Sequence, residues 1–222
     1  FVGGAPIQNI GAYGVEIKDI FVSCSGYFLD TIEKKKFELN DCQFSYRSSI
    51  FKKSLRNKFI ITEVVLQLSK TNHKISKSYK SINDALNKKK IHNPTIKDIA
   101  RIVSKIRENK LPNPSLIGNS GSFFKNPIVS IELLNKLKQK FSKLVYFKES
   151  VSKYKLSAAW LIENCNFKNI EEKNVGVYKN QALVIINLGN ATGKDILLFS
   201  KKIKSTVLEK FDILLEEEVN II

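Results

Sequence analysis

The pattern of apolar residues changes along the chain near residue 95. Before it, apolar residues gather in strand-like runs over 14–38 and again over 59–68, where β-branched residues are frequent and suit a central strand. After it, apolar residues such as Ile96, Ile99 and Ile106 recur at helical spacing behind a capping threonine, Thr95. We therefore predict a chain that mixes helices and strands in an α+β arrangement.

Proline residues suggest where this chain divides. Leu111-Pro112-Asn113-Pro114 holds two prolines in four residues, which is typical of a boundary. We expect a first domain over 1–111, a second over 112–211, and a returning C-terminal strand over 212–222. The lysine-rich stretch 71–94 is predicted to be a mobile insertion with a short helix near Ile82–Leu86. Further elements are predicted as helices after Ser130, around 158–162 and after Thr192, and as strands over 182–187 and 213–215.

The charge of the chain raises a nucleic-acid hypothesis. Lys and Arg number 37 against 21 Asp and Glu, which gives a formal net charge of +16. Nearly all of the basic residues are lysines, and they are spread along the chain among Asn and Ile, as in proteins from AT-rich genomes. A nucleic-acid-binding protein stays an alternative, and it would gather its basic residues on one face. The charge also suits a small anionic substrate.

Cysteine usage argues against disulfides and metal. Cys24, Cys42 and Cys165 form no CxxC pair, and neither histidine lies near them in sequence. We expect reduced thiols, a cytoplasmic protein and no metal. No apolar run reaches the roughly 18 residues of a membrane span, and no signal peptide opens the chain. The sequence contains no Met, so we expect Phe1 to be an internal point of a longer protein.

Two segments of the first domain suit anionic ligands. Residues 6–14, Pro-Ile-Gln-Asn-Ile-Gly-Ala-Tyr-Gly, carry glycines that let a backbone approach a ligand and expose N–H groups to phosphate. A turn before a strand explains them equally well. Arg47, flanked by Tyr, Ser and Phe in 44–52, suits an anion or a developing negative charge. The alternative is an ordinary arginine on an edge strand.

Two later segments are candidates as well. A loop over 110–127 combines small polar residues, two glycines, two aromatics and prolines at the predicted boundary, where ligand clefts often lie. A serine in it could donate a proton, whereas a plain linker would be more polar and less aromatic. Glu216, Glu217 and Glu218 form an acidic cluster near the C-terminus, and such clusters are usually just solvated.

Together these segments resemble the UDP-N-acetylenolpyruvoylglucosamine reductase (UDP-N-acetylmuramate dehydrogenase) family nearly end to end. The most specific stretches are 6–14, Tyr-Arg-Ser-Ser-Ile-Phe at 46–51, Gly-Asn-Ser-Gly-Ser-Phe-Phe-Lys-Asn-Pro at 118–127 and Gln-Ala-Leu-Val-Ile-Ile-Asn at 181–187. Ala-Ala-Trp-Leu-Ile-Glu at 158–163 supports them. The resemblance implies the C-terminal part of a PCMH-type FAD-binding domain over 1–111, followed by an α+β substrate-binding domain.

The resemblance also implies an activity and a set of site residues. FAD, reduced by NADPH, would reduce the enolpyruvyl group of UDP-N-acetylglucosamine enolpyruvate in peptidoglycan precursor synthesis, in a monomer that binds neither nucleic acid nor membrane. Arg47 and Glu218 would flank the enolpyruvyl group, and Ser122 would give the proton. The remaining residues that it implies are Pro6, Ile7, Gly11 and Gly14 for the cofactor, and Tyr79, Lys110, Asn126, Gln181 and Tyr146 for the substrate.

The chain departs from the family pattern in three places. The first FAD-binding segment, with its glycine-rich loop, is expected upstream of Phe1. The tail beyond Glu218 is short, and Glu217 stands where the family commonly has a proline. Glu218 is taken as the catalytic glutamate because it directly precedes Val219. An inactive remnant and a different FAD oxidoreductase stay open as alternatives. The insertion 71–94 carries Tyr79, as in the subgroup that retains this loop.

Overall fold

A computed structural model describes residues 2–73, 75 and 79–222 of the chain. It forms two compact units, residues 1–103 (unit 1) and 104–222 (unit 2). The division falls inside helix α2 (Ile96–Lys110), whereas the prolines had suggested a boundary after residue 111. The mixture of helices and antiparallel sheets confirms the predicted α+β class. Within the described residues, no helix is long and apolar enough to cross a bilayer.

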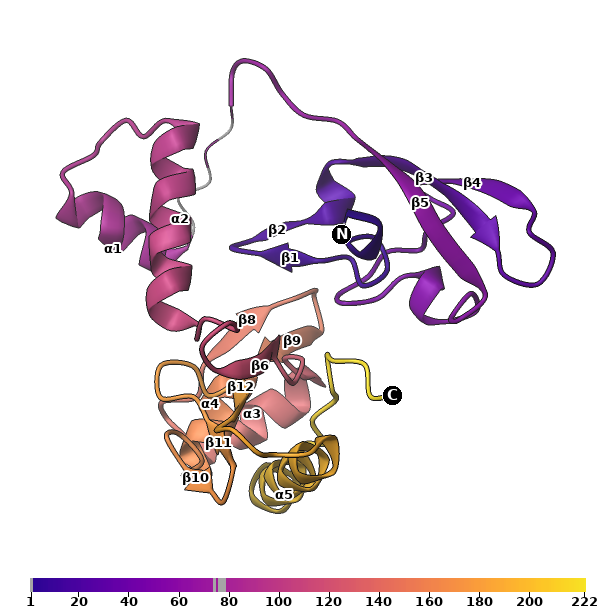
Figure 1. Ribbon diagram of the computed structural model, residues 1–222. Coiled ribbons are helices and arrows are strands. Elements are labelled where there is room, and N and C mark those ends of the chain that lie inside the picture. The colour runs from indigo at the N-terminus through magenta and orange to yellow at the C-terminus, as the bar shows by residue number, and fades with distance from the viewer. Residues whose placement is uncertain (1, 74, 76–78) are drawn as a thin grey trace. The chain divides into compact units, whose positions relative to one another are not determined.

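Unit 1 contains a three-stranded antiparallel sheet, and a small hairpin of β1 and β2 precedes that sheet in the sequence (Figure 1). The sheet has the order β4-β3-β5, so β3 is central and β5, predicted to be central, lies at an edge in the described structure. Exposed Ile60 and Val65 on β5 fit an edge strand with one solvated face. The elements of unit 1 are η1 (Val2–Gly4), β1 (Gly11–Ala12), β2 (Val15–Glu16), η2 (Ile17–Asp19), β3 (Phe21–Phe28), β4 (Lys34–Glu38), η3 (Ile50–Lys52), β5 (Phe59–Leu66), α1 (Lys80–Lys88) and most of α2.

A cluster of phenylalanines fills the core of unit 1. Phe37 lies edge-on to both Phe51 and Phe59, at ring-centroid distances of 5.4 and 5.1 Å. Aromatic pairs prefer this geometry because the positive ring edge meets the negative face. At Gly26 the backbones of β3 and β5 come so close that a Cβ atom would lie 1.8 Å from the Ile60 carbonyl oxygen. Only glycine therefore fits this position of the sheet.

The insertion at 71–94 is described in part. Its predicted short helix is confirmed as α1, which buries Ile82 and Leu86 four residues apart. Residues 74 and 76–78 lie outside the described residues, and the predicted mobility of the insertion stays a prediction. Helix α2 begins where Thr95 was expected to cap it, because the Asp98 N–H donates to Thr95 Oγ1 at 3.2 Å.

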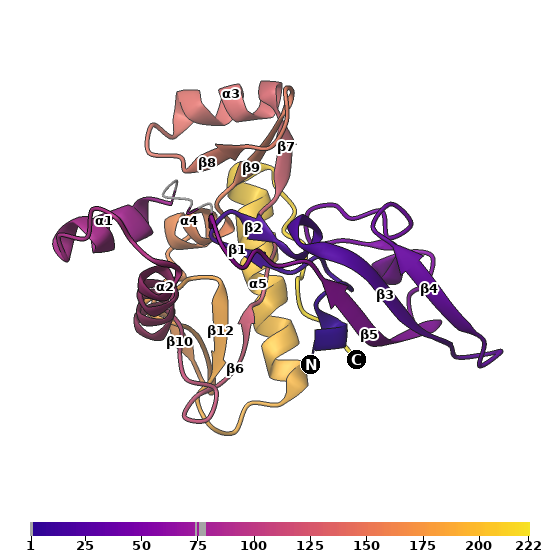
Figure 2. The same ribbon diagram turned by 90° about the horizontal axis from the view of Figure 1, so that it is seen from above.

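Unit 2 has two antiparallel sheets with helices packed on them (Figure 2). One sheet has the order β10-β11-β12-β6 and contacts α5, and the other has the order β7-β9-β8 and contacts α3. The elements of unit 2 are β6 (Gly118–Ser122), β7 (Ile128–Ser130), α3 (Ile131–Lys140), β8 (Tyr146–Lys148), β9 (Lys153–Leu156), α4 (Ala158–Asn164), β10 (Glu171–Glu172), β11 (Val175–Val177), β12 (Val184–Asn187) and α5 (Gly193–Phe211).

The predicted helices of unit 2 are confirmed, and their caps explain where they begin. Ser130 caps α3, and Thr192 forms a reciprocal capping box with Asp195 at the start of α5. The buried strand predicted over 182–187 is β12. Helix α5 ends at Phe211 and is followed by Asp212, whose φ of 59° is left-handed. The core gathers residues from α3, α4, α5 and the four-stranded sheet, and Leu161, Ile203 and Val207 in it are fully buried.

Two sequence predictions in unit 2 were wrong. The strand predicted around 213–215 does not form: Ile213 and Leu215 are buried and Leu214 is exposed, as in a strand, but no neighbouring strand lies in register with them. The chain makes a β-bridge slightly later, between Glu217 and Phe124. The motif around 118–122, predicted as loop, is strand β6, because backbone pairing with β12 needs no β-branched side chain.

Candidate functional site

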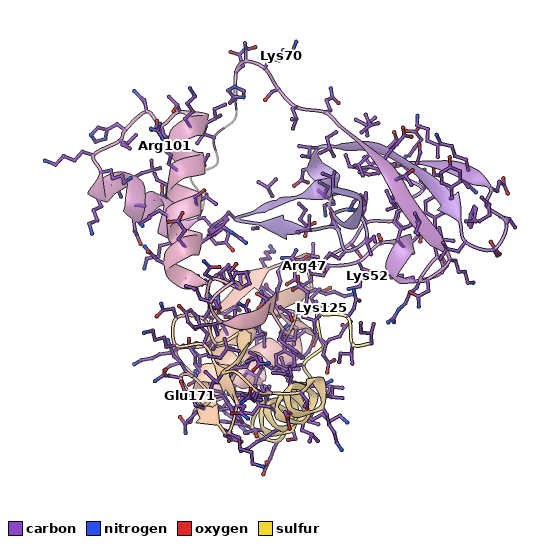
Figure 3. The ribbon with its side chains drawn as sticks, viewed as in Figure 1. Arg47, Lys52, Lys70, Arg101, Lys125 and Glu171 are labelled. Carbon is purple, nitrogen blue, oxygen red and sulfur yellow. The ribbon has the colours of Figure 1, made fainter. Side chains whose placement is uncertain are left out.

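Arg47 lies in a tight turn of unit 1 (labelled in Figure 3). Ser45 and Ser48 exchange two backbone hydrogen bonds of 3.0 Å, so Tyr46 and Arg47 are the two turn residues. Arg47 has a left-handed φ of 51°, which is unusual for a residue with a long side chain. Its Nη2 donates to the Gly11 carbonyl at 2.7 Å, and its guanidinium lies 5.2 Å from the Tyr46 ring centroid. Strained backbone of this kind gathers at functional sites.

A buried asparagine ties this turn to the segment 6–18. Asn9 is fully buried, and its Nδ2 donates to Glu16 Oε2 at 2.8 Å and to the Ser45 carbonyl at 3.1 Å. Its Oδ1 accepts the Lys18 N–H at 3.1 Å. Partial burial would raise the pKa of Glu16, but hydrogen bonds from Lys18 and Asn9 and the charges of Lys18 and Arg47 lower that pKa below its ordinary value. Glu16 is therefore held as a carboxylate close to Arg47.

The four cofactor candidates lie in this same network. Pro6 is buried, and the Ile7 carbonyl accepts a hydrogen bond from Ser49 Oγ, two residues beyond Arg47. Gly11 supplies the carbonyl that Arg47 binds. Gly14, with a φ of 82°, and Tyr13, with a φ of 55°, form the two-residue turn between β1 and β2. These glycines serve the backbone conformation, and their contact with a cofactor stays a prediction.

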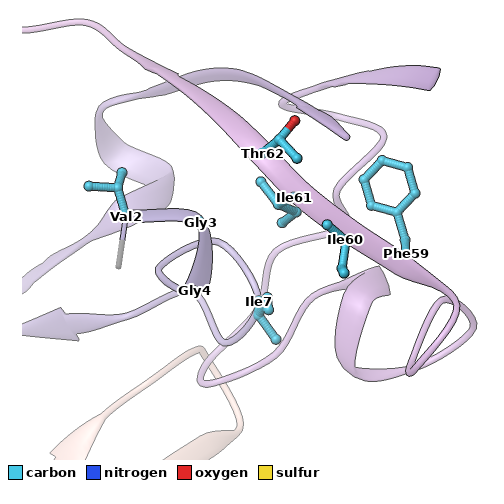
Figure 4. A pocket seen from close by; sticks show the side chains of 8 residues that line it. All are labelled: Val2, Gly3, Gly4, Ile7, Phe59, Ile60, Ile61 and Thr62. Carbon is cyan, nitrogen blue, oxygen red and sulfur yellow. The ribbon is translucent and has the colours of Figure 1, made fainter. Parts of the chain in front are cut away.

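A pocket of about 510 Å³ opens beside this network (Figure 4). One wall is strand β5, and a Cβ atom on Gly4 would meet nothing within 4 Å. Its wall on β5 is largely apolar. Ile7 lines it, and Pro6, Gly11 and Gly14 do not. The residues that line it are Val2, Gly3, Gly4, Ile7, Phe59, Ile60, Ile61 and Thr62.

Tyr79, the predicted substrate clamp, contacts a residue that the sequence analysis passed over. Its ring meets that of Tyr13 edge-on at a centroid distance of 5.3 Å. Tyr79 is 41% exposed at the start of α1, and Tyr13 lies at the tip of the β1–β2 hairpin. Two aromatic rings on separate loops form a surface on which a planar group can stack. The sequence holds one sign of the turn that carries Tyr13: the Tyr13-Gly14 pair, in which the glycine favours a tight turn.

Backbone pairing brings the candidates of unit 2 together. Ser122 at the end of β6 is the register partner of Val184 on β12, and the next residue, Phe123, donates its N–H to the Leu183 carbonyl at 2.7 Å. The Glu218 N–H in turn donates to the Phe123 carbonyl at 2.8 Å. Ser122 therefore has β12 on one side and the segment of Glu218 on the other.

The substrate candidates of unit 2 border this strand. Gln181 lies just before β12, and its neighbour Asn180 donates a side-chain hydrogen bond to the Asn109 carbonyl at 3.0 Å. This bond fixes the backbone next to Lys110, whose side chain is exposed at the end of α2. The five candidates Lys110, Ser122, Asn126, Gln181 and Glu218 thus lie on segments that are bonded to one another.

Asn126 has a structural use that the sequence did not suggest. Its Oδ1 accepts the Ala158 N–H at 2.9 Å, in the first turn of α4. The substrate contact of Asn126 stays a prediction. Tyr146 lies on the edge strand β8, where Lys138 is 5.1 Å from its ring centroid and Tyr154 is 6.1 Å away.

The three glutamates have different surroundings. Glu216 pairs with Lys125, which Figure 3 labels, and Glu217 pairs with Lys204 of α5 at 2.7 Å. The Glu218 N–H donates to the carbonyl of Phe123, the residue after Ser122. The assignment of Glu218 as the glutamate of the site stays a prediction. The roles of Lys204, Asn9 and Glu16 had no signal in the sequence, because each depends on a partner distant in the chain or on burial.

Comparison with known proteins identifies relatives along nearly all of the chain. Residues 113–222 match the family model of the UDP-N-acetylenolpyruvoylglucosamine reductase C-terminal domain. The chain is 49% identical over 221 residues to the UDP-N-acetylenolpyruvoylglucosamine reductase of Flavobacterium johnsoniae, covering 100% of this chain and 66% of the relative. It is 44% identical over 221 residues to that of Amoebophilus asiaticus, covering 100% and 65%. It thus spans slightly less than two thirds of the length of these curated relatives.

A solved structure has the same fold. The crystal structure of UDP-N-acetylenolpyruvylglucosamine reductase (MurB) from Thermus caldophilus superposes with a TM-score of 0.61 at 20% sequence identity. The match covers 99% of this chain and 59% of that one. At 20% sequence identity, this similarity supports a shared fold and nothing further.

Proposed function

Because the chain belongs to the UDP-N-acetylenolpyruvoylglucosamine reductase family, we propose that the complete protein reduces UDP-N-acetylglucosamine enolpyruvate to UDP-N-acetylmuramate. The reaction would use FAD and NADPH, in the cytoplasm, as a step of peptidoglycan precursor synthesis by a monomeric enzyme. The observation that carries the proposal is the backbone pairing of residues 123–125, directly after Ser122, with residues 216–218, inside a unit that matches the family.

When bound, FAD supplies the two-electron reduction of the substrate alkene. Ile7 and the wall of β5 offer it an apolar surface, and Arg47 binds the Gly11 carbonyl in the same network. During reduction, negative charge builds on the carboxylate conjugated to the alkene. The guanidinium of Arg47 stabilises that charge, because its turn holds it in place and it needs no reorganisation as the charge develops.

Ser122 donates the proton that completes the saturated product. A serine hydroxyl is a weak acid, so its position matters more than its pKa. The neighbouring strands hold the backbone of Ser122, and the Glu218 segment lies next to it. Glu218 would therefore be the third catalytic residue, with Arg47 and Ser122. Lys110, Asn126, Gln181 and Tyr79 bind the nucleotide sugar, Lys110 through its charge against the pyrophosphate and Tyr79 by closing over the substrate.

The two half-reactions test this proposal. In the complete protein with FAD bound, Ser122→Ala should leave flavin reduction by NADPH unchanged, since that step needs no proton at the substrate. Reoxidation by the enolpyruvyl substrate should slow about a hundred- to ten-thousand-fold, the usual range for a general acid. Ser120→Ala, two residues earlier on β6, is the matched control. Stopped-flow traces in which both half-reactions slow equally would remove Ser122 from the chemistry.

A further inference from the structure

The segment after α5 is held by contacts on both of its faces. Its backbone pairs with residues 123–125 through two hydrogen bonds, Lys125 N–H to the Glu216 carbonyl at 2.9 Å and Glu218 N–H to the Phe123 carbonyl at 2.8 Å. These two bonds flank the bridge between Phe124 and Glu217. Bridge partners of this type have their side chains close together on one face. Glu217 therefore lies on the face of Phe124, which is almost completely buried, and Glu216 lies on the opposite face.

On each face of this segment, a glutamate forms an ion pair with a lysine. Glu216 pairs with Lys125, whose N–H also donates to the Glu216 carbonyl, and the Glu216 side chain is 72% exposed. Glu217 pairs with Lys204, whose Nζ lies 2.7 Å from Oε1, and the two side chains are only 23% and 21% exposed. Solvent screens a pair of this kind less than a pair on the surface. The second pair is thus the stronger link between this segment and the rest of unit 2.

Lys204 reaches the segment from a rigid support. It follows Ile203 and lies one turn from Ser200 and Val207, all three fully buried on the core side of α5. The helix is fixed at its start by the Thr192 capping box and along its length by the core. Through its ion pair with Glu217, Lys204 therefore connects the segment of Glu218 to the firmly packed helix α5.

We propose that Lys204 is a positioning residue, which acts through Glu217 to hold Glu218 in register beside Ser122. The proposal rests on the proposed function for its kinetic part. The Lys204–Glu217 pair and the Glu218–Phe123 hydrogen bond lie on consecutive residues, so loss of the ion pair loosens the bond that joins the Glu218 backbone to the residue after Ser122. A misplacement of about 1 Å at a reacting group can reduce a rate about a hundred-fold.

Hydrogen exchange tests the structural part independently of catalysis. In Lys204→Met, the amide of Glu218, which donates to the Phe123 carbonyl, should exchange about ten-fold faster than in the wild type, measured by mass spectrometry on peptides from 212–222. Lys202→Met is the matched control, because Lys202 lies on the same helix and forms an ion pair with Glu172, away from the segment 216–218. The control should leave this exchange unchanged. Equal exchange in wild type and Lys204→Met would overturn the proposal.

The half-reactions test the positioning role in the complete protein with FAD bound. Lys204→Met should slow reoxidation by the enolpyruvyl substrate about ten- to a hundred-fold and leave reduction by NADPH unchanged. Lys204→Arg should restore most of the rate, and so should the exchanged pair Lys204→Glu with Glu217→Lys. A merely structural lysine would slow both half-reactions alike or lower only the melting temperature, and either result would refute positioning.

The two proposals fail in different ways. If the wild-type complete protein does not reduce the enolpyruvyl substrate, the proposed function is wrong, and hydrogen exchange still decides whether Lys204 holds the segment. If the wild type is active and Lys204→Met keeps its full rate of reoxidation, the proposed function stands and the positioning role is wrong.

Discussion

Asn9 should be among the most sensitive positions of unit 1. It is fully buried and makes three side-chain hydrogen bonds, to the Glu16 carboxylate, the Ser45 carbonyl and the Lys18 N–H. A hydrogen bond to a charged group contributes about 1.5–3 kcal/mol to stability and a neutral one about 1 kcal/mol. Removing the side chain should therefore lower the free energy of unfolding of unit 1 by about 3–5 kcal/mol.

The backbone of Asn9 separates two substitutions. Its φ of 47° is left-handed, a conformation that glycine adopts freely and that costs other residues about 1–2 kcal/mol. Asn9→Ala and Asn9→Gly lose the same hydrogen bonds, but Asn9→Ala should be less stable than Asn9→Gly by about 1 kcal/mol. Urea denaturation followed by circular dichroism measures both, and exchange of the Lys18 amide, which donates to Asn9, reports the local effect.

Asn9→Asp provides a third measurement if those variants fail to fold. It keeps an acceptor for the Lys18 N–H but places a second carboxylate against Glu16, which lies 2.8 Å from the present amide nitrogen. The variant should be strongly destabilised at pH 7 and should recover as the pH falls and one of the two carboxylates takes up a proton. A loss below about 1 kcal/mol in all three variants would refute the assignment of Asn9 as the buried centre of this network.

Three further predictions concern stability and reactivity. Gly26→Ala should prevent unit 1 from folding, because its Cβ would lie 1.8 Å from the Ile60 carbonyl oxygen, whereas Gly4→Ala should be tolerated; circular dichroism of both variants decides, and a folded Gly26→Ala would contradict the close approach. Because the pKa of Glu16 is lowered in the folded state, its stabilising contribution is complete above the ordinary value of 4.5 and is lost as the pH falls through the lower folded pKa, so Glu16→Gln should flatten the acid side of the stability profile. A thiol reagent should label at most Cys165 in the native protein and all three cysteines in urea, since the other two are fully buried; rapid native labelling of three would contradict this burial.

Periodicity predicted the helices well because their signals are local. Thr95, Ser130 and Thr192 each cap a helix at the expected place, and each cap depends on residues within one turn. The strands were harder to predict, because a strand needs a partner that the local sequence does not name. Residues 118–122 form β6 because β12 lies beside them, and 213–215, despite strand-like alternation, form none.

The candidate site, too, was predictable from sequence only where its signals are local. The motif of Arg47 could be identified from sequence, but not its turn, since a left-handed φ is typical of Gly or Asn and not of Arg. The contact of Tyr13 with Tyr79 joins segments far apart in the chain. The pairing of Lys204 with Glu217 joins a helix to the irregular segment that follows it. The proximity of Cys24 and Cys42 was hidden because they lie on separate segments; the Cys42 thiol donates a hydrogen bond to Cys24, and this bond and burial raise the pKa of Cys42.

The bridge between Phe124 and Glu217 bears on how the protein matures during synthesis. Ser122 and its strand leave the ribosome early, whereas Glu217 and Glu218 follow only after α5 has been made. Until then the carbonyl of Phe123 and the N–H of Lys125 have no chain to pair with on that side. Such late, long-range closure is slow and leaves an open edge during translation. Nascent chains that stall before Glu217 should therefore present this edge to chaperones and proteases, and only chains that extend past Glu218 should acquire the site around Ser122.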